Sequence, residues 1–285
     1  MDGPALLFGV LIPAIFAVVV LLVSARRARA EPSIARPFAG ALALGVAFLV
    51  AKAGLDSVPP LPFGPDALGV LGMIFWCVVA AIVLAPLRNA PVIGRFGNAF
   101  YVALFSILPY HLIRDSSKPA SAFDAGGFAT VLIVYALWSS LERLARRRPG
   151  PSLPLALWAA CAGTAVVLLE NRSALQAQLA GSLAAALGAA VVVTFLVRGS
   201  HLSTGAIAIL AIVVSALLRQ ATIYDLPTPC WALLAVAFAA PWIGEIKALR
   251  RRSPLLAGVA AFLGALIPTA IAAWLVHDLR ALPVY

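Results

Sequence analysis

Charged residues are scarce in this chain: Asp, Glu, Lys and Arg make up 11% of its 285 residues, against about 25% in a typical soluble domain. Hydrophobic residues make up 63%, against about 45–50% in soluble domains. The core of a soluble protein of this length could not enclose that much apolar surface. The shortage of charge therefore excludes a soluble globular protein and indicates an integral membrane protein.

The charge that is present is mostly positive, with 21 Lys and Arg residues against 11 Asp and Glu residues and a net charge of +10. These basic residues lie in short clusters between apolar runs, a distribution that sets membrane topology and is not typical of a nucleic-acid-binding face. We therefore expect the lipid bilayer as a partner and no nucleic acid. Because arginine far outnumbers lysine, and alanine, glycine and proline are abundant, we expect a protein of a bacterial inner membrane.

Motifs for catalysis and cofactor binding are missing as well. The sequence has three cysteines without a C-x-x-C spacing and only three histidines, His111, His201 and His277. It contains no H-E-x-x-H pair, no G-x-S-x-G elbow, no P-loop and no dinucleotide fingerprint. We therefore predict no catalytic residue, no metal site and no cofactor, which weighs against an enzyme.

Long apolar runs dominate what is present, and a helix needs about 20 mostly apolar residues to cross the hydrocarbon core. We predict an all-α polytopic transmembrane bundle of about ten spans, a single domain over residues 1–285 with no soluble domain. Eight spans remain an alternative, since losing one adjacent pair leaves the alternation of sides unchanged. The predicted spans are 5–24, 37–55, 67–87, 97–113, 127–145, 153–170, 174–197, 203–222, 229–247 and 254–277.

The sorting of charge along the chain predicts the orientation of these spans. With the N-terminus outside, the inner connections carry 15 of the 21 basic residues but only three of the 11 acidic residues. Cytoplasmic loops of membrane proteins are enriched in Lys and Arg, so we predict that both termini lie outside the cytoplasm. The basic residues left on the outer side are Lys52, Arg114, Lys118, Arg172, Arg219 and Arg280.

No ionisable residue lies at the centre of a predicted span, where a charge is costly and usually has a function. Lys52 with Asp56, and Glu142 with Arg146, are spaced by one helical turn and predict ion pairs near the ends of their spans.

Polar residues gather at the outer ends of spans four, seven, eight and ten. If these spans are neighbours, the residues line an outward-facing pocket suited to an anionic or sugar-like headgroup. The alternative is that these helix ends are simply solvated. The predicted substrate-binding residues are His111, Arg114, Gln176, Gln178, Arg219 and His277.

Prolines interrupt several predicted spans, and each should kink its helix because proline lacks a backbone N–H. The predicted kinks lie at Pro13, Pro109, Pro241 and Pro268. The chain divides into halves 1–148 and 149–285 of five spans each, so the second half would be an inverted repeat of the first. Pro109 and Pro241 then fall in corresponding spans. In this general architecture the chain resembles the five-plus-five transporters, and inverted-repeat transporters bind substrate at broken helices.

Three functions remain open on the sequence alone. Kinked helices and ten spans favour a permease for a small molecule or a lipid headgroup. The apolar centre and the missing motifs favour a non-catalytic membrane subunit or scaffold that binds another membrane protein. The outer polar residues favour a membrane-embedded transferase acting at the outer face, in which His111, Arg114 and His277 would have to converge.

Overall fold

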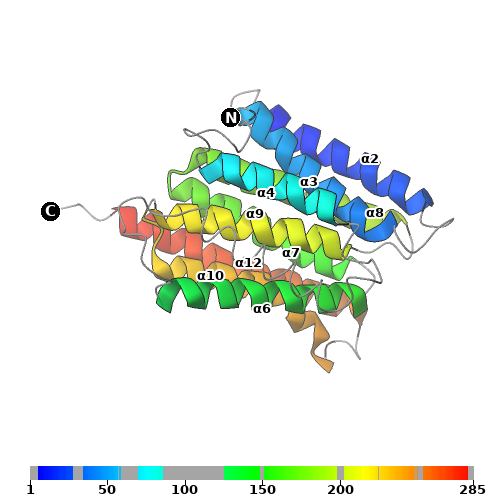
Figure 1. Ribbon diagram of the computed structural model, residues 1–285. Coiled ribbons are helices and arrows are strands. Elements are labelled where there is room, and N and C mark those ends of the chain that lie inside the picture. Colours follow the sequence, from blue (N-terminus) through cyan, green and yellow to red (C-terminus); the bar gives the residue numbers. More distant parts are fainter. Residues whose placement is uncertain are drawn as a thin grey trace.

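The structure, a computed structural model, describes residues 6–27, 35–56, 58, 70–85, 125–147, 151–197, 202–223, 225–247, 249 and 253–281. Every regular element in these ranges is a helix, and the helices pack lengthwise into a bundle (Figure 1). The predicted all-α architecture is confirmed. The elements are the π-helix η1 (Leu7–Leu11), α2 (Ile12–Arg27), α3 (Ala35–Leu55), α4 (Val70–Leu84), α6 (Ala125–Arg147), α7 (Ser152–Glu170), α8 (Ala174–Leu196), α9 (Thr204–Ile223), α10 (Thr228–Ala239), the 3-10 helix η3 (Ala240–Glu245) and α12 (Pro254–Ala281).

Several of these helices have the length and composition of membrane spans. Two shorter apolar helices, Ala39–Leu55 and Ile74–Leu84, accompany them. The described helices lie within a few residues of the predicted spans, except for the predicted span 97–113, which falls outside the described residues. The chain is therefore a helical membrane protein. Five described helices are long and apolar enough to cross a bilayer: Leu7–Arg26, Ser152–Glu170, Ala174–Leu196, Thr204–Ala221 and Leu256–Leu279.

Two of the predicted proline kinks mark a change of helix type. Pro13 is the second residue of α2 and lies just after the π-helical turn η1, at whose end the Ile12 N–H bonds to the Leu7 carbonyl five residues back. Pro241 follows the end of α10 at Ala239, and the chain continues as the 3-10 helix η3. The predicted span 229–247 is thus two helices of different pitch, because Pro241 cannot donate the hydrogen bond that α10 would need to continue.

The other two predicted kinks differ. Pro268 lies inside α12, which continues through it to Ala281. Beside it the buried hydroxyl of Thr269 donates to the carbonyl oxygens of Ala265 and Leu266, at 3.1 and 2.8 Å. Pro109 lies outside the described residues.

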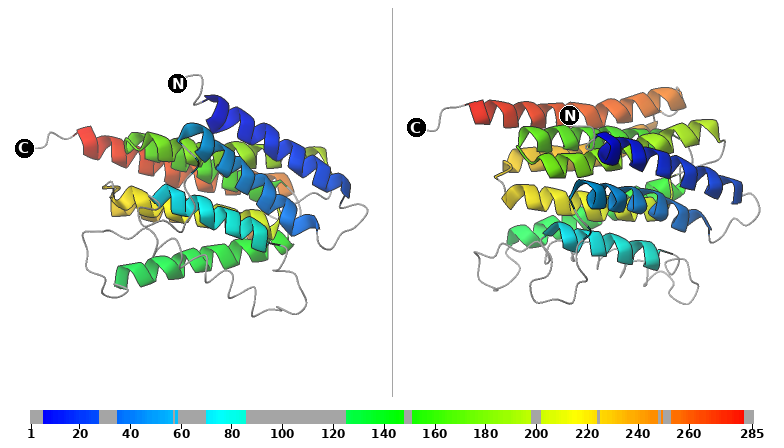
Figure 2. Two further views of the ribbon diagram at one scale, coloured as in Figure 1. Left: turned by 45° about the horizontal axis from the view of Figure 1, so that its top comes forward. Right: turned by 90° about the horizontal axis from the view of Figure 1, so that it is seen from above.

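Contacts between helices fix their relative directions. α7 and α12 are parallel neighbours, since Gly163 faces Thr269 and Glu170 meets His277 two turns further along both helices. α3 and α9 are also parallel, because Gly40, near the start of α3, lies against Ser203 before the start of α9. Figure 2 shows α12 at one side of the bundle and α4 and α6 at the other.

The charged ends of the helices therefore collect at two opposite ends of the bundle. We name these the acidic face and the basic face; the chain end labelled C in Figure 1 marks the acidic face. Described residues of the acidic face include Asp56, Glu170, Asp225 and Asp278. Described residues of the basic face include Arg26, Arg143, Arg146, Arg147 and Lys247.

Among the five candidate spans of the described residues, Thr204–Ala221 of α9 has the largest buried share, 78%, against 61% for α8. α9 contacts α3, α4, α6 and α8. α8 is less enclosed, although it is rich in small residues. Of its two glycines, Gly188 packs against Trp158, whereas an added Cβ on Gly181 would meet nothing within 4 Å. Small residues thus indicated close packing on α7, but did not identify the most central helix.

Candidate functional site

The polar side chains buried about one turn or less from the acidic face include Lys52, Gln176 and Gln220. Lys52 lies in the last turn of α3, Gln176 in the first turn of α8 and Gln220 in the last turn of α9. Their exposed fractions are 2%, 4% and 9%. Because α3, α8 and α9 contact one another, these residues lie at a similar depth in one part of the bundle. We call Lys52, Gln176 and Gln220 the polar cluster.

The two glutamines of the polar cluster carry unsatisfied oxygens. The side-chain Oε1 atoms of Gln176 and Gln220 are buried and have no hydrogen-bond partner among the described residues. A buried polar atom left unsatisfied costs about 1–3 kcal/mol, so native proteins rarely keep one without a reason. The two acceptors belong to contacting helices, α8 and α9.

The charge of Lys52 is balanced within its own helix. Its Nζ forms an ion pair with the carboxylate of Asp56, one turn further on, as the sequence predicted. The Lys52 side chain is 3% exposed, whereas that of Asp56 is 41% exposed. The ammonium group is therefore held inside the bundle beneath a carboxylate that reaches the acidic face.

The predicted substrate-binding residues do not all belong to this cluster. Gln176 does, and the half-buried Arg219 precedes Gln220 on α9. Gln178 lies two residues beyond Gln176, so a step of about 200° around α8 separates the two side chains. His277 lies on α12 at the other side of α7, and His111 and Arg114 lie outside the described residues. His277 and Gln178 thus lie apart from the polar cluster.

His277 meets a different partner. Its Nδ1 lies 3.2 Å from Oε2 of Glu170, a contact between the acidic ends of α12 and α7. The two side chains are 72% and 41% exposed. Such an exposed pair contributes little to stability, so the contact marks how α7 and α12 align and does not form an enclosed site.

The basic end of α6 holds a second buried polar group. Glu142 Oε1 accepts a 2.8 Å hydrogen bond from Nε1 of the fully buried Trp138, and Glu142 Oε2 lies 3.7 Å from the Arg146 guanidinium. The predicted pair of Glu142 and Arg146 is confirmed. Its additional partner, the Trp138 indole, is spaced one turn before Glu142 and was missed from the sequence.

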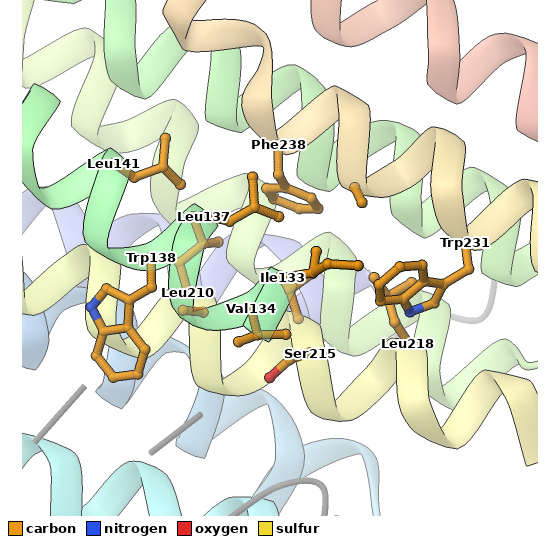
Figure 3. A pocket seen from close by; sticks show the side chains of 13 residues that line it. Ile133, Val134, Leu137, Trp138, Leu141, Leu210, Ser215, Leu218, Trp231 and Phe238 are labelled. Atoms are coloured by element: carbon orange, nitrogen blue, oxygen red, sulfur yellow. The ribbon is translucent and has the colours of Figure 1, made fainter. Parts of the chain in front are cut away.

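An apolar cleft lies between α6, α9 and α10, with a volume of about 60 Å³ (Figure 3). Its one side-chain hydroxyl, on Ser215, donates to the Ile212 carbonyl of its own helix. Figure 3 shows that Trp231 and Leu218 lie toward one end of the cleft, and Trp138 and Leu141 toward the other. The described lining of the cleft therefore consists almost entirely of carbon atoms.

Metal binding has no support among the described residues, in which no three His, Cys, Asp or Glu side chains gather. Comparisons with protein-family models, with curated proteins and with solved structures find no match. The arguments for function therefore rest on the polar cluster and on the packing around it.

Sequence reasoning missed two members of the polar cluster as binding residues. Lys52 was assigned to an ion pair at the membrane interface, which is present but buried. Gln220 was not among the predicted substrate-binding residues, although Arg219 beside it was. The signal for both was a polar residue inside the apolar run of its helix, one turn from the end.

Proposed function

We propose that the chain crosses a bacterial inner membrane ten times with the acidic face outside the cytoplasm. The segregation of basic side chains at one end of the bundle supports this orientation through the positive-inside rule. The alternation of basic and acidic connections along the sequence supports the span count.

We further propose that the protein is a permease for a small polyhydroxylated solute of the sugar or polyol class. The single observation that carries this proposal is the pair of buried, unsatisfied Oε1 atoms of Gln176 and Gln220 near the acidic face. A carboxamide oxygen is a hydrogen-bond acceptor, and hydroxyl groups are the donors that a sugar or polyol supplies. An anion is less suitable, because the Lys52 ammonium is already paired with Asp56.

The middle of the bundle bears on how such a permease would work. Below the polar cluster the contacting helices are filled by buried apolar residues, including Phe48, Leu183 and Val213. The conformation described is then one in which the solute site lies near the outer surface and the path inward is closed. Passage would require helices to move, and the helix-type change at Pro241 provides a break in a helix of the second half.

The inverted repeat remains a prediction without support from the packing. α7 packs along α12, whereas their counterparts in the first half, α2 and α6, lie on opposite sides of the bundle (Figure 1). The proposed permease therefore does not depend on a five-plus-five symmetry.

Thermal unfolding of the purified protein in nanodiscs tests the solute proposal. We expect sugars or polyols such as glucose, glycerol or inositol to raise the Tm of the wild-type protein and of Gln178→Leu. Gln220→Leu should abolish this rise, because it removes one of the two acceptors. If these compounds leave the wild-type Tm unchanged, or stabilise Gln220→Leu equally, the proposal is wrong. Uptake of a stabilising solute into proteoliposomes then tests transport.

A non-catalytic membrane subunit or scaffold is the second candidate. It is favoured by the apolar middle of the bundle, where the hydroxyls of Thr164 and Ser182 bond to carbonyls of their own helices. A scaffold would retain a second membrane protein through detergent purification and show no solute-dependent Tm. The outer-face transferase lacks such support, because the described His277 is exposed and pairs with Glu170.

A further inference from the structure

We draw no further inference here: the strongest candidate, the apolar cleft of about 60 Å³ between α6, α9 and α10, is lined almost entirely by carbon atoms, and nothing in the structure shows what occupies it.

Discussion

Gly163 and Thr269 face each other so closely that a Cβ added to Gly163 would lie 2.3 Å from both the Cβ and the Oγ1 of Thr269. This approach lets α7 and α12 lie side by side from the basic face to the contact of Glu170 with His277. Without a hydrophobic driving force between helices in lipid, such close packing is a main source of helix association. The parallel pair of α7 and α12 is therefore a stabilising unit of the bundle.

Gly163→Ala is expected to destabilise the protein, because the added methyl group must displace Thr269 or separate the two helices. Overpacking of this kind costs about 1–3 kcal/mol. Gly181→Ala on α8 is the matched control, since its Cβ meets nothing within 4 Å. The control should gain about 0.5–1 kcal/mol from the better helix propensity of alanine. Thermal unfolding in nanodiscs measures both, and equal Tm values for the two variants would refute the packing argument.

Glu142→Leu is expected to lower stability by about 1–3 kcal/mol, because it removes the carboxylate that accepts the hydrogen bond of the buried Trp138 N–H. Glu142→Gln should lose less, since its carboxamide oxygen can still accept that hydrogen bond. Glu170→Gln changes a half-exposed carboxylate and is the control; its effect should stay within about 1 kcal/mol. The account of the Trp138–Glu142 contact fails if Glu142→Leu and Glu142→Gln unfold at the same temperature as the wild type.

Single cysteines at the two faces report the orientation in the membrane. The native Cys77, Cys161 and Cys230 are buried and should not react with a membrane-impermeant maleimide. In right-side-out spheroplasts we expect the reagent to label Asp278→Cys at the acidic face. Arg147→Cys at the basic face should react only after the membrane is permeabilised. The opposite labelling pattern would invert the proposed topology.

The sequence predicted those structural features that follow directly from residue type or from residue spacing. Apolar runs predicted the helices, since the bilayer demands spans of a set length, and the spacing of one helical turn predicted the pairs at Lys52 and Glu142. The arrangement of the helices was harder to predict. α8 is rich in small residues, whereas α9 is more enclosed, because burial depends on the number of neighbouring helices and not on the size of side chains.

The candidate site was only partly predictable for a related reason. A polar residue near a helix end can face water, lipid or another helix, and the sequence does not give the rotation of the helix. Gln176 and Gln178 looked equivalent on α8, although the structure buries Gln176 and leaves Gln178 partly exposed. His277 was grouped with them by depth alone, and the structure pairs it with Glu170 on another side of the bundle.

The stability of the ligand-free protein tests the central claim, that Gln176 and Gln220 are kept for binding and not for folding. The measurement is the Tm in nanodiscs of the double variant Gln176→Leu/Gln220→Leu, with Gln178→Leu as control. The double substitution removes two buried, unsatisfied oxygens. The account therefore predicts that the double variant is more stable than the wild type, by about 1–3 kcal/mol for each oxygen removed. The Tm of the control should be nearly unchanged. A double variant that unfolds at a lower temperature than the wild type would show that the two glutamines stabilise the fold, and would contradict the account.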